Sequence, residues 1–386
     1  MNLSRATVRW PTIVLTIVLM LAPSDGPAAA APLAGSESGS AWDLLLAGEH
    51  DAARASFAQA LRAEPADLDQ AIGLAALLEA RGQIDVALDV LADALAKQDA
   101  SGLMTRGSWL AALELSEDAL DGGARCLPLL ERLLAGELTS PDPEIVVRAR
   151  IALGDILRRS GAAERAAEHA SERSGLPTLW TLLGPYGHFS RLEMTRVFPP
   201  ERGDLEPGDD HTPPSAHPPS RLSTRFADGR VFFPDAFLGF GVSYAVADFE
   251  LSSAAEVLVW VRPTTSARLL LNGNELFAAD RWRERPPDAH SARVRLGAGR
   301  HRVLLKLPVE DRPPAFLLAI VRAGDGGLVE GLRWVAVDDE APLAQAQVLS
   351  SGQTMESDHA AASAPASEPA AAIAALWWLK QRGLQR

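Results

Sequence analysis

The sequence predicts a multidomain chain of α and β type, in which an N-terminal α-helical solenoid is followed by an antiparallel β-sandwich of jelly-roll type. Two observations predict this. A helical pattern between residues 41 and 95 recurs after 34 positions, and short β-rich runs separated by turn residues begin near Trp180. The 386 residues, of which 47% are hydrophobic, are enough for two or more domains with their own cores.

Small and bulky residues that return at a fixed spacing define the helical pattern. The pairs related by 34 positions are Gly48 and Gly82, Ala53 and Ala87, Phe57 and Leu91, and Ala60 and Ala94. Glycine is favoured at the turn between antiparallel helices, and alanine is favoured where helices approach closely. Gly154 and Gly161 continue the same offsets, so we expect helical repeats over residues 36–175.

These offsets resemble the tetratricopeptide repeat, whose period is 34 residues. The resemblance implies stacked helical hairpins with a concave groove that binds an extended peptide or a protein. Asp69, Gln70 and Arg148 are candidate groove residues, and the alternative is that they form a solvated face without a ligand. The step from this fold to a function is analogy, because such arrays serve many unrelated ligands.

Residues 1–31 have the layout of a secretory signal peptide. Arg5 and Arg9 provide a positive start, an uncharged apolar run spans 10–22, and small residues follow. Because the run is short for a bilayer span, we expect cleavage, and an uncleaved membrane anchor is the alternative. The protein is therefore expected to be exported to the periplasm, the cell envelope or the medium.

The charge and cysteine content exclude further classes. A net charge of −13 argues against general nucleic-acid binding, which requires basic residues to neutralise phosphates. Cys126 is the single cysteine and has apolar neighbours, so a buried structural thiol is expected and no intrachain disulfide can form. The sequence shows no catalytic triad, zinc-ligand cluster or phosphate loop. We therefore expect no enzymatic activity, no metal and no cofactor.

Residues 178–340 have the pattern of an antiparallel sandwich. The predicted strands cover 244–251, 257–261, 268–271, 292–296, 300–307 and 316–321. Asn272-Gly273 predicts a tight hairpin turn, because the centre of such a turn requires positive φ.

The segments RLLLNGNELF, VRLGAGRHRVLLKLP and FLLAIVRAGDGG together resemble the galactose-binding-like β-sandwich. WTLLGPYGHF, which begins at Trp180, and FPPE, at 198–201, resemble the segment that precedes this sandwich in large bacterial secreted tetratricopeptide proteins. Some of those proteins carry a transglutaminase-like domain further along. This chain resembles their non-catalytic N-terminal part, and its sequence has no Cys-His-Asp set for that activity.

An arginine-rich stretch of the β half is a candidate glycan-binding surface. The candidate ligand-binding residues are Trp282, Arg283, Arg293, Arg295 and Arg302. Arginines two apart on a strand share one face, and Trp282 could stack on a sugar ring. The alternative is an exposed sheet face whose charge is balanced by Glu284 and Asp288.

The tail has two parts, a Ser/Ala-rich flexible linker at 341–372 and a short C-terminal helix at 373–386. Taken together, the sequence predicts an exported, non-catalytic interaction or scaffold protein that binds a protein or peptide partner through a helical groove. The alternative is a carbohydrate-binding or envelope-adhering module that acts through the β-sandwich.

Overall fold

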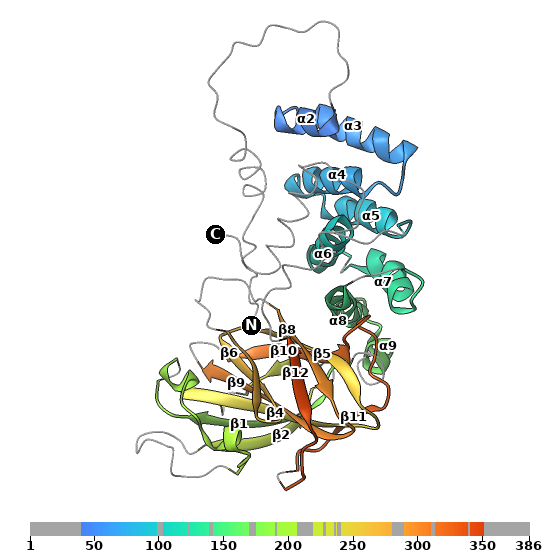
Figure 1. Cartoon of the computed structure of the whole chain (residues 1–386). Coiled ribbons are helices and arrows are strands. Elements are labelled where there is room, and N and C mark those ends of the chain that lie inside the picture. The colour runs from blue at the N-terminus through green and yellow to red at the C-terminus, as the bar shows by residue number, and fades with distance from the viewer. Residues whose placement is uncertain are drawn as a thin grey trace, which may run out of the picture. The chain divides into compact units, whose positions relative to one another are not determined.

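The computed structural model of the chain (Figure 1) has two compact units, a helical unit up to residue 139 and a sheet unit from residue 140. The predicted signal peptide, 1–31, and the predicted C-terminal helix, 373–386, lie outside the described residues. The structure describes residues 40–98, 103–121, 123–138, 142–169, 175–189, 191–206, 219–226, 229–234, 237, 241–279, 289–309, 313–338 and 340–350.

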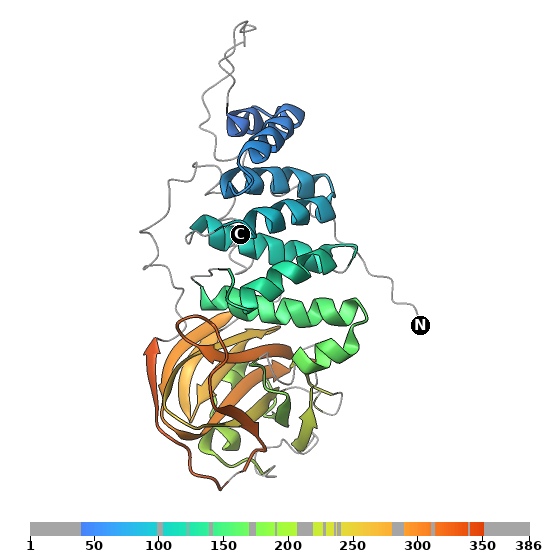
Figure 2. The ribbon, with the colours of Figure 1, turned by 90° about the vertical axis from the view of Figure 1, so that its right-hand side faces the viewer.

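The helical unit consists of helices that pack on their neighbours in chain order (Figure 2). They are α2 (Ala41–Leu46), α3 (His50–Ala63), α4 (Leu68–Ala80), α5 (Ile84–Leu95), α6 (Leu103–Asp118), η1 (Ala124–Cys126) and α7 (Leu127–Leu134). Ser40 and Asp67 begin α2 and α4, because their side chains accept hydrogen bonds from the first free backbone N–H groups.

The 34-residue pattern occupies the packing positions expected of it. Gly48, Gly82 and Gly161 have φ of 79°, 73° and 80° at the helix–helix turns, where a side chain would be strained. The side chains of Ala53, Phe57, Ala87, Leu91 and Ala94 are buried, whereas Ala60 is half-buried. The pattern therefore reports how neighbouring helices pack locally.

The predicted fold class is wrong. The described residues form a mixed α/β chain with two antiparallel sheets, and a helical solenoid does not define it. The physical reason is visible at α8 (Pro143–Arg159) and α9 (Ala163–Glu168), which contain or flank Gly154 and Gly161 but belong to the sheet unit. The repeat offsets describe contacts between two helices, and they do not specify whether the next partner is a helix or a sheet.

Seven strands form the first sheet and five form the second in the part of the chain that is described. The order is β2-β1-β4-β9-β6-β7 in the first sheet, with β11 also paired to β4, and β12-β8-β5-β10-β3 in the second. The strands are β1 (Leu179–Tyr186), β2 (Ser220–Arg225), β3 (Val231–Phe232), β4 (Gly241–Leu251), β5 (Ala255–Pro263), β6 (Ala267–Leu271), β7 (Asn274–Ala279), β8 (His290–Leu296), β9 (Gly299–Val309), β10 (Ala315–Arg322), β11 (Leu332–Val335) and β12 (Ala346–Ser350).

Alternate residues of the two sheets meet in one apolar core. Val259 of β5 and Leu305 of β9 are fully buried members of it. The predicted strand runs fall within β4, β5, β6, β8, β9 and β10. Asn272 and Gly273 have φ of 51° and 78°, so the β6–β7 turn has the positive φ that the Asn-Gly pair predicts.

Helix α8 covers the outer face of the second sheet. Val147 and Ile151 of α8 pack with Trp260 of β5 and Leu317 of β10 in a second apolar cluster. The contacts therefore divide the chain near residue 140, whereas the sequence placed the end of the helical domain at 175. Strand β12 also lies within the range 341–372 that was predicted as linker. It pairs with β8. The Ser/Ala-rich composition around it is typical of a linker and does not predict a strand.

Candidate functional site

The structure separates the arginines that were predicted to form one glycan-binding face. Arg293 and Arg295 alternate with core residue Val294 on β8, so they point to the outer side of the second sheet. Arg302 alternates with core residue Val303 on β9, so it lies on the outer side of the first sheet. The core of the sandwich lies between the two sets. Trp282 and Arg283 lie outside the described residues.

Arg302 is engaged in a buried ion pair. Its Nε and Nη2 donate to the two carboxylate oxygens of Asp248 over 2.8 and 2.9 Å. Asp248 is 0% exposed, and Arg302 Nη2 also donates to the carbonyl of Asp338 over 2.6 Å. A guanidinium that is bound at both edges in this way holds the chain together and cannot turn outward to bind a sugar.

Asn272 and His301 extend this cluster, which we call the Asp248 cluster. Asn272 Oδ1 accepts from the backbone N–H of Arg302 over 2.8 Å, and its Nδ2 lies 2.9 Å from His301 Nδ1. The ring of His301 therefore accepts at Nδ1 and donates from Nε2 to the carbonyl of Gly297, 2.9 Å away. Burial lowers the pKa of His301, and the bond to Gly297 opposes this. The cluster fixes a neutral histidine.

A second buried polar cluster, the Glu201 cluster, lies elsewhere on the outer face of the first sheet. Lys306 Nζ is 2.9 Å from Glu201 Oε1, and the hydroxyl of Tyr244 donates to the same oxygen over 2.6 Å. Arg268 Nη1 lies 3.5 Å from Glu201 Oε2. Burial lowers the pKa of Lys306, and the bond to Glu201 opposes this. Burial, followed by the charge of Glu201, raises the pKa of Tyr244 well above its usual range.

The Glu201 cluster attaches a segment that we call the cap, residues 187–189 and 191–206. The cap contains η3 (Leu192–Met194) and η4 (Pro199–Arg202). Lys306 Nζ donates to the carbonyl of Arg196, and Arg268 donates to the carbonyl of Met194 over 3.0 Å. Phe198 and Leu205 of the cap pack with Tyr186 and Tyr244 of the first sheet in an apolar cluster. The cluster has acid, base and phenol groups, but Lys306 and Tyr244 are 0% exposed. The hydrogen bonds and ion pairs of this cluster therefore hold the cap on the first sheet.

The remaining sequence candidates lie apart from these clusters. Asp69 accepts from Trp42 Nε1 over 3.0 Å in the helical unit, beside Gln70. Arg148 pairs with Glu144 at 3.1 Å and belongs to the sheet unit. Cys126 is buried, as its apolar neighbours predict. Burial raises the pKa of its thiol to about 12, with smaller contributions from the charges of Asp121 and Asp89, so the thiol is protonated at neutral pH.

Among the residues that the structure describes, no group of three or more His, Cys, Asp or Glu side chains could hold a metal ion. In the same residues, no helix has the length and apolar character needed to cross a bilayer.

The sequence did not single out Glu201, Tyr244 or Asp248 as members of polar clusters. The FPPE segment contains Glu201, but a carboxylate after two prolines ordinarily reads as a loop residue. The signal that could have found the clusters is the row of charged residues on β9, a strand that is otherwise buried. Buried charges require partners, so each basic residue in such a strand predicts an acid elsewhere in the chain.

No family model and no curated protein matches the chain. Among solved structures, it is similar to a β-glucosidase from Kluyveromyces marxianus in complex with glucose, at 12% identity and a TM-score of 0.26, over 38% of this chain and 17% of that chain. It is also similar to an α-xylosidase from Xanthomonas citri, at 14% identity and a TM-score of 0.23, over 43% of this chain and 18% of that one. The chain thus spans less than a fifth of either protein.

Both proteins carry enzyme names. At these TM-scores the similarity carries no argument about the activity of this chain.

Proposed function

We propose that this chain is an exported, non-catalytic interaction protein that binds a basic segment of a protein partner through its helical unit. The observation that supports this is the distribution of charge. Residues 40–139 contain 17 acidic side chains and seven basic ones, so they account for −10 of the total charge of −13. A concentrated negative field attracts basic partners and accelerates their association.

Some of these acids form ion pairs inside the helical unit. Arg81 pairs with Asp51, Arg125 pairs with Asp89 and Asp121, and Arg132 pairs with Glu137. Other acids, such as Asp93 and Asp118, lie exposed on the surface. Export is supported by the layout of residues 1–31, and a non-catalytic role is supported by the sealed state of the two charged clusters in the sheet unit.

The test compares two variants of the full chain that change the net charge equally. Asp93→Asn with Asp118→Asn makes the helical unit less negative by two charges, and Glu330→Gln with Glu340→Gln is the matched control in the sheet unit. We expect wild type to bind basic amphipathic peptides in preference to acidic peptides of the same length, with an affinity that falls at high salt. The helical variant should bind severalfold more weakly, and the control should bind as wild type does.

Two results would contradict the proposal: no preference for basic peptides, or equal losses in both variants.

The carbohydrate-binding alternative depends on Arg293 and Arg295 among the described candidate residues, because Arg302 is engaged by Asp248. If retention on an acidic polysaccharide is lost in Arg293→Ala with Arg295→Ala, the sandwich is the binding half.

A further inference from the structure

The outward side of the cap combines exposed apolar side chains with arginines. Phe189, Leu192 and Val197 are 62%, 74% and 46% exposed, and they lie within nine residues of one another. Arg191, Arg196 and Arg202 are exposed between and beyond them. We call these six residues the apolar–basic patch. Exposed large apolar side chains that gather in one short segment make that segment a candidate interaction site.

The exposed charge of the patch has a single sign, although the chain as a whole is acidic. The acidic residues between 188 and 202 are Glu193 and Glu201, and both point inward, since their side chains are 10% and 4% exposed. Arg196 lies 3.6 Å from Glu193, and its guanidinium is 5.1 Å from the centre of the Phe198 ring. The next acids, Asp204 and Glu206, follow the patch, and Glu206 pairs with Arg221 at 2.6 Å.

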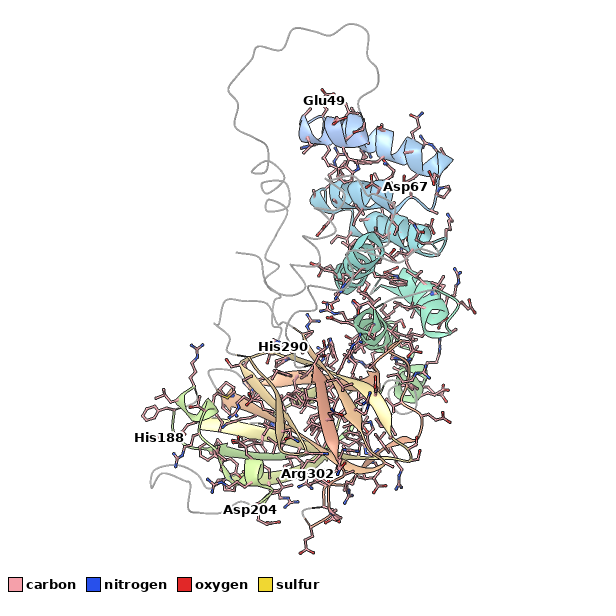
Figure 3. All side chains as sticks on the ribbon, in the orientation of Figure 1. Glu49, Asp67, His188, Asp204, His290 and Arg302 are labelled. Carbon is pink, nitrogen blue, oxygen red and sulfur yellow. The ribbon has the colours of Figure 1, made fainter. Side chains whose placement is uncertain are left out.

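Side chains from beneath hold the backbone of the patch in one conformation. Glu193 Oε1 accepts from the backbone N–H of His188 over 3.1 Å, and the backbone N–H of Glu193 donates to the carbonyl of Phe189 over 3.0 Å. Lys306 and Arg268 bind the carbonyls of Arg196 and Met194, as described above. Figure 3 places His188 at the rim of the sheet unit, where side chains project away from the strands. A surface fixed in this way binds without a large ordering cost.

We infer that the apolar–basic patch docks the protein on the surface of an anionic phospholipid bilayer. Apolar side chains enter the interface between headgroups and acyl chains one by one, whereas a stable protein interface needs about 800 Å² from each partner. Three apolar side chains meet the first requirement more readily than the second. The arginines place their charge at the lipid phosphates while their stems lie along the apolar region. The inference concerns the sheet unit, so it is independent of the function proposed for the helical unit.

The negative net charge of the chain opposes binding to an anionic bilayer, so the effect of lipid composition must come from the patch. An acidic protein is repelled by an anionic surface at long range, but charges beyond about 8–10 Å are screened at physiological salt. Contact therefore depends on the patch itself. We expect binding to vesicles of phosphatidylcholine mixed with phosphatidylglycerol, and little binding to phosphatidylcholine alone.

Co-sedimentation of the full chain with both kinds of vesicle tests the inference. Phe189→Ser with Leu192→Ser should weaken binding at least about tenfold, because the apolar contact is lost. The matched control, Leu222→Ser with Phe232→Ser, changes side chains that are 39% and 50% exposed elsewhere on the sheet unit, and it should bind as wild type does.

The charge of the patch is tested separately, and the position of the cap is measured directly. Arg202→Gln should weaken binding about fivefold, and Arg225→Gln, a control on β2, should not. An environment-sensitive dye on Leu192→Cys should shift to shorter emission wavelengths with anionic vesicles, whereas the same dye on Phe232→Cys should not. The dye will select the new cysteine, because Cys126 is 1% exposed.

Several results would overturn the inference. They are equal binding to neutral and anionic vesicles, unchanged binding of the Phe189 and Leu192 variant, equal loss in its control, or no emission shift at position 192. If no vesicle binds and an acidic protein is captured through the same residues, the patch is a protein interface and the lipid assignment is wrong.

Discussion

Replacing Arg302 with methionine should destabilise the sheet unit strongly, whereas the same change at Arg295 should not. Asp248 is 0% exposed and receives two hydrogen bonds from Arg302. Arg302→Met removes both bonds and leaves the buried carboxylate with a more distant cation, since Arg300 Nε lies 3.8 Å from Asp248 Oδ2. Breaking one partner of a buried pair in this way costs about 3–5 kcal/mol. Arg295 pairs with Glu256 at the surface, where both side chains are about half exposed, and such pairs contribute roughly 0.2–1 kcal/mol.

Thermal and urea denaturation of the full chain measure the difference. A domain of this size loses about 2–4 °C in Tm for each kcal/mol, so Arg302→Met should lower the Tm of the sheet unit by roughly 10 °C. Arg295→Met should lower it by less than about 4 °C. A second variant, Asp248→Leu with Arg302→Met, removes both charges and should recover part of the loss.

An Arg302→Met variant that is no less stable than Arg295→Met would contradict this prediction. So would a double variant, Asp248→Leu with Arg302→Met, that is less stable than Arg302→Met alone. In either case the loss could not be attributed to a buried carboxylate that has lost its two hydrogen bonds.

Two further predictions concern packing and pH. Gly73→Ala should destabilise the helical unit by about 1–3 kcal/mol in urea denaturation, because the new Cβ would lie 2.5 Å from Cζ of Phe57. Gly48→Ala is the control, since its Cβ would meet no atom within 4 Å and the variant tests the strain of positive φ alone. An equal loss at both positions would contradict the packing explanation. The lowered pKa of His301 means that this histidine binds a proton more readily in the unfolded chain than in the folded one. The contribution of the neutral ring to stability is therefore complete above about pH 6.5 and is lost as the pH falls below that value. His301→Gln should flatten this dependence, and parallel pH profiles of the two proteins would contradict it.

Strands β4, β5, β6, β8, β9 and β10 were predictable from the sequence, and the reason is local. Alternation along β5 and β9 records which side of each strand faces the core, and Asn272-Gly273 records the sign of φ at one turn. The helical pairs were predictable for the same reason, since Ala53 and Phe57 describe contacts between adjacent helices. Each of these signals needs information from a few neighbouring residues.

What the sequence did not reveal depends on residues far apart in the chain. Lys306 meets Glu201 across 105 positions, and Arg302 meets Asp248 across 54. The choice of a sheet as partner for α8 is equally non-local, because Val147 would be apolar against either a helix or a strand. Glu201 lies in a segment whose composition resembles an ordinary loop, and Asp248 lies in a strand whose sequence does not name its partner. The buried pairs could therefore not be told from surface charges.

Strand β9 explains why its arginines were misinterpreted as a ligand face. Its outward residues Arg300, Arg302 and Lys306 do alternate as the prediction required, but two chain segments cover them. Arg300 donates to the carbonyl of Ala336 over 3.1 Å, Arg302 donates to that of Asp338, and Lys306 donates to that of Arg196. One face of one strand thus fastens both the segment before β12 and the cap. Alternation along a strand identifies the side of the sheet to which a residue points. It does not show whether another segment of the chain covers that side and keeps the residue from solvent. The cap can therefore expose apolar residues on its outer surface because the basic residues of β9 hold its inner surface in place.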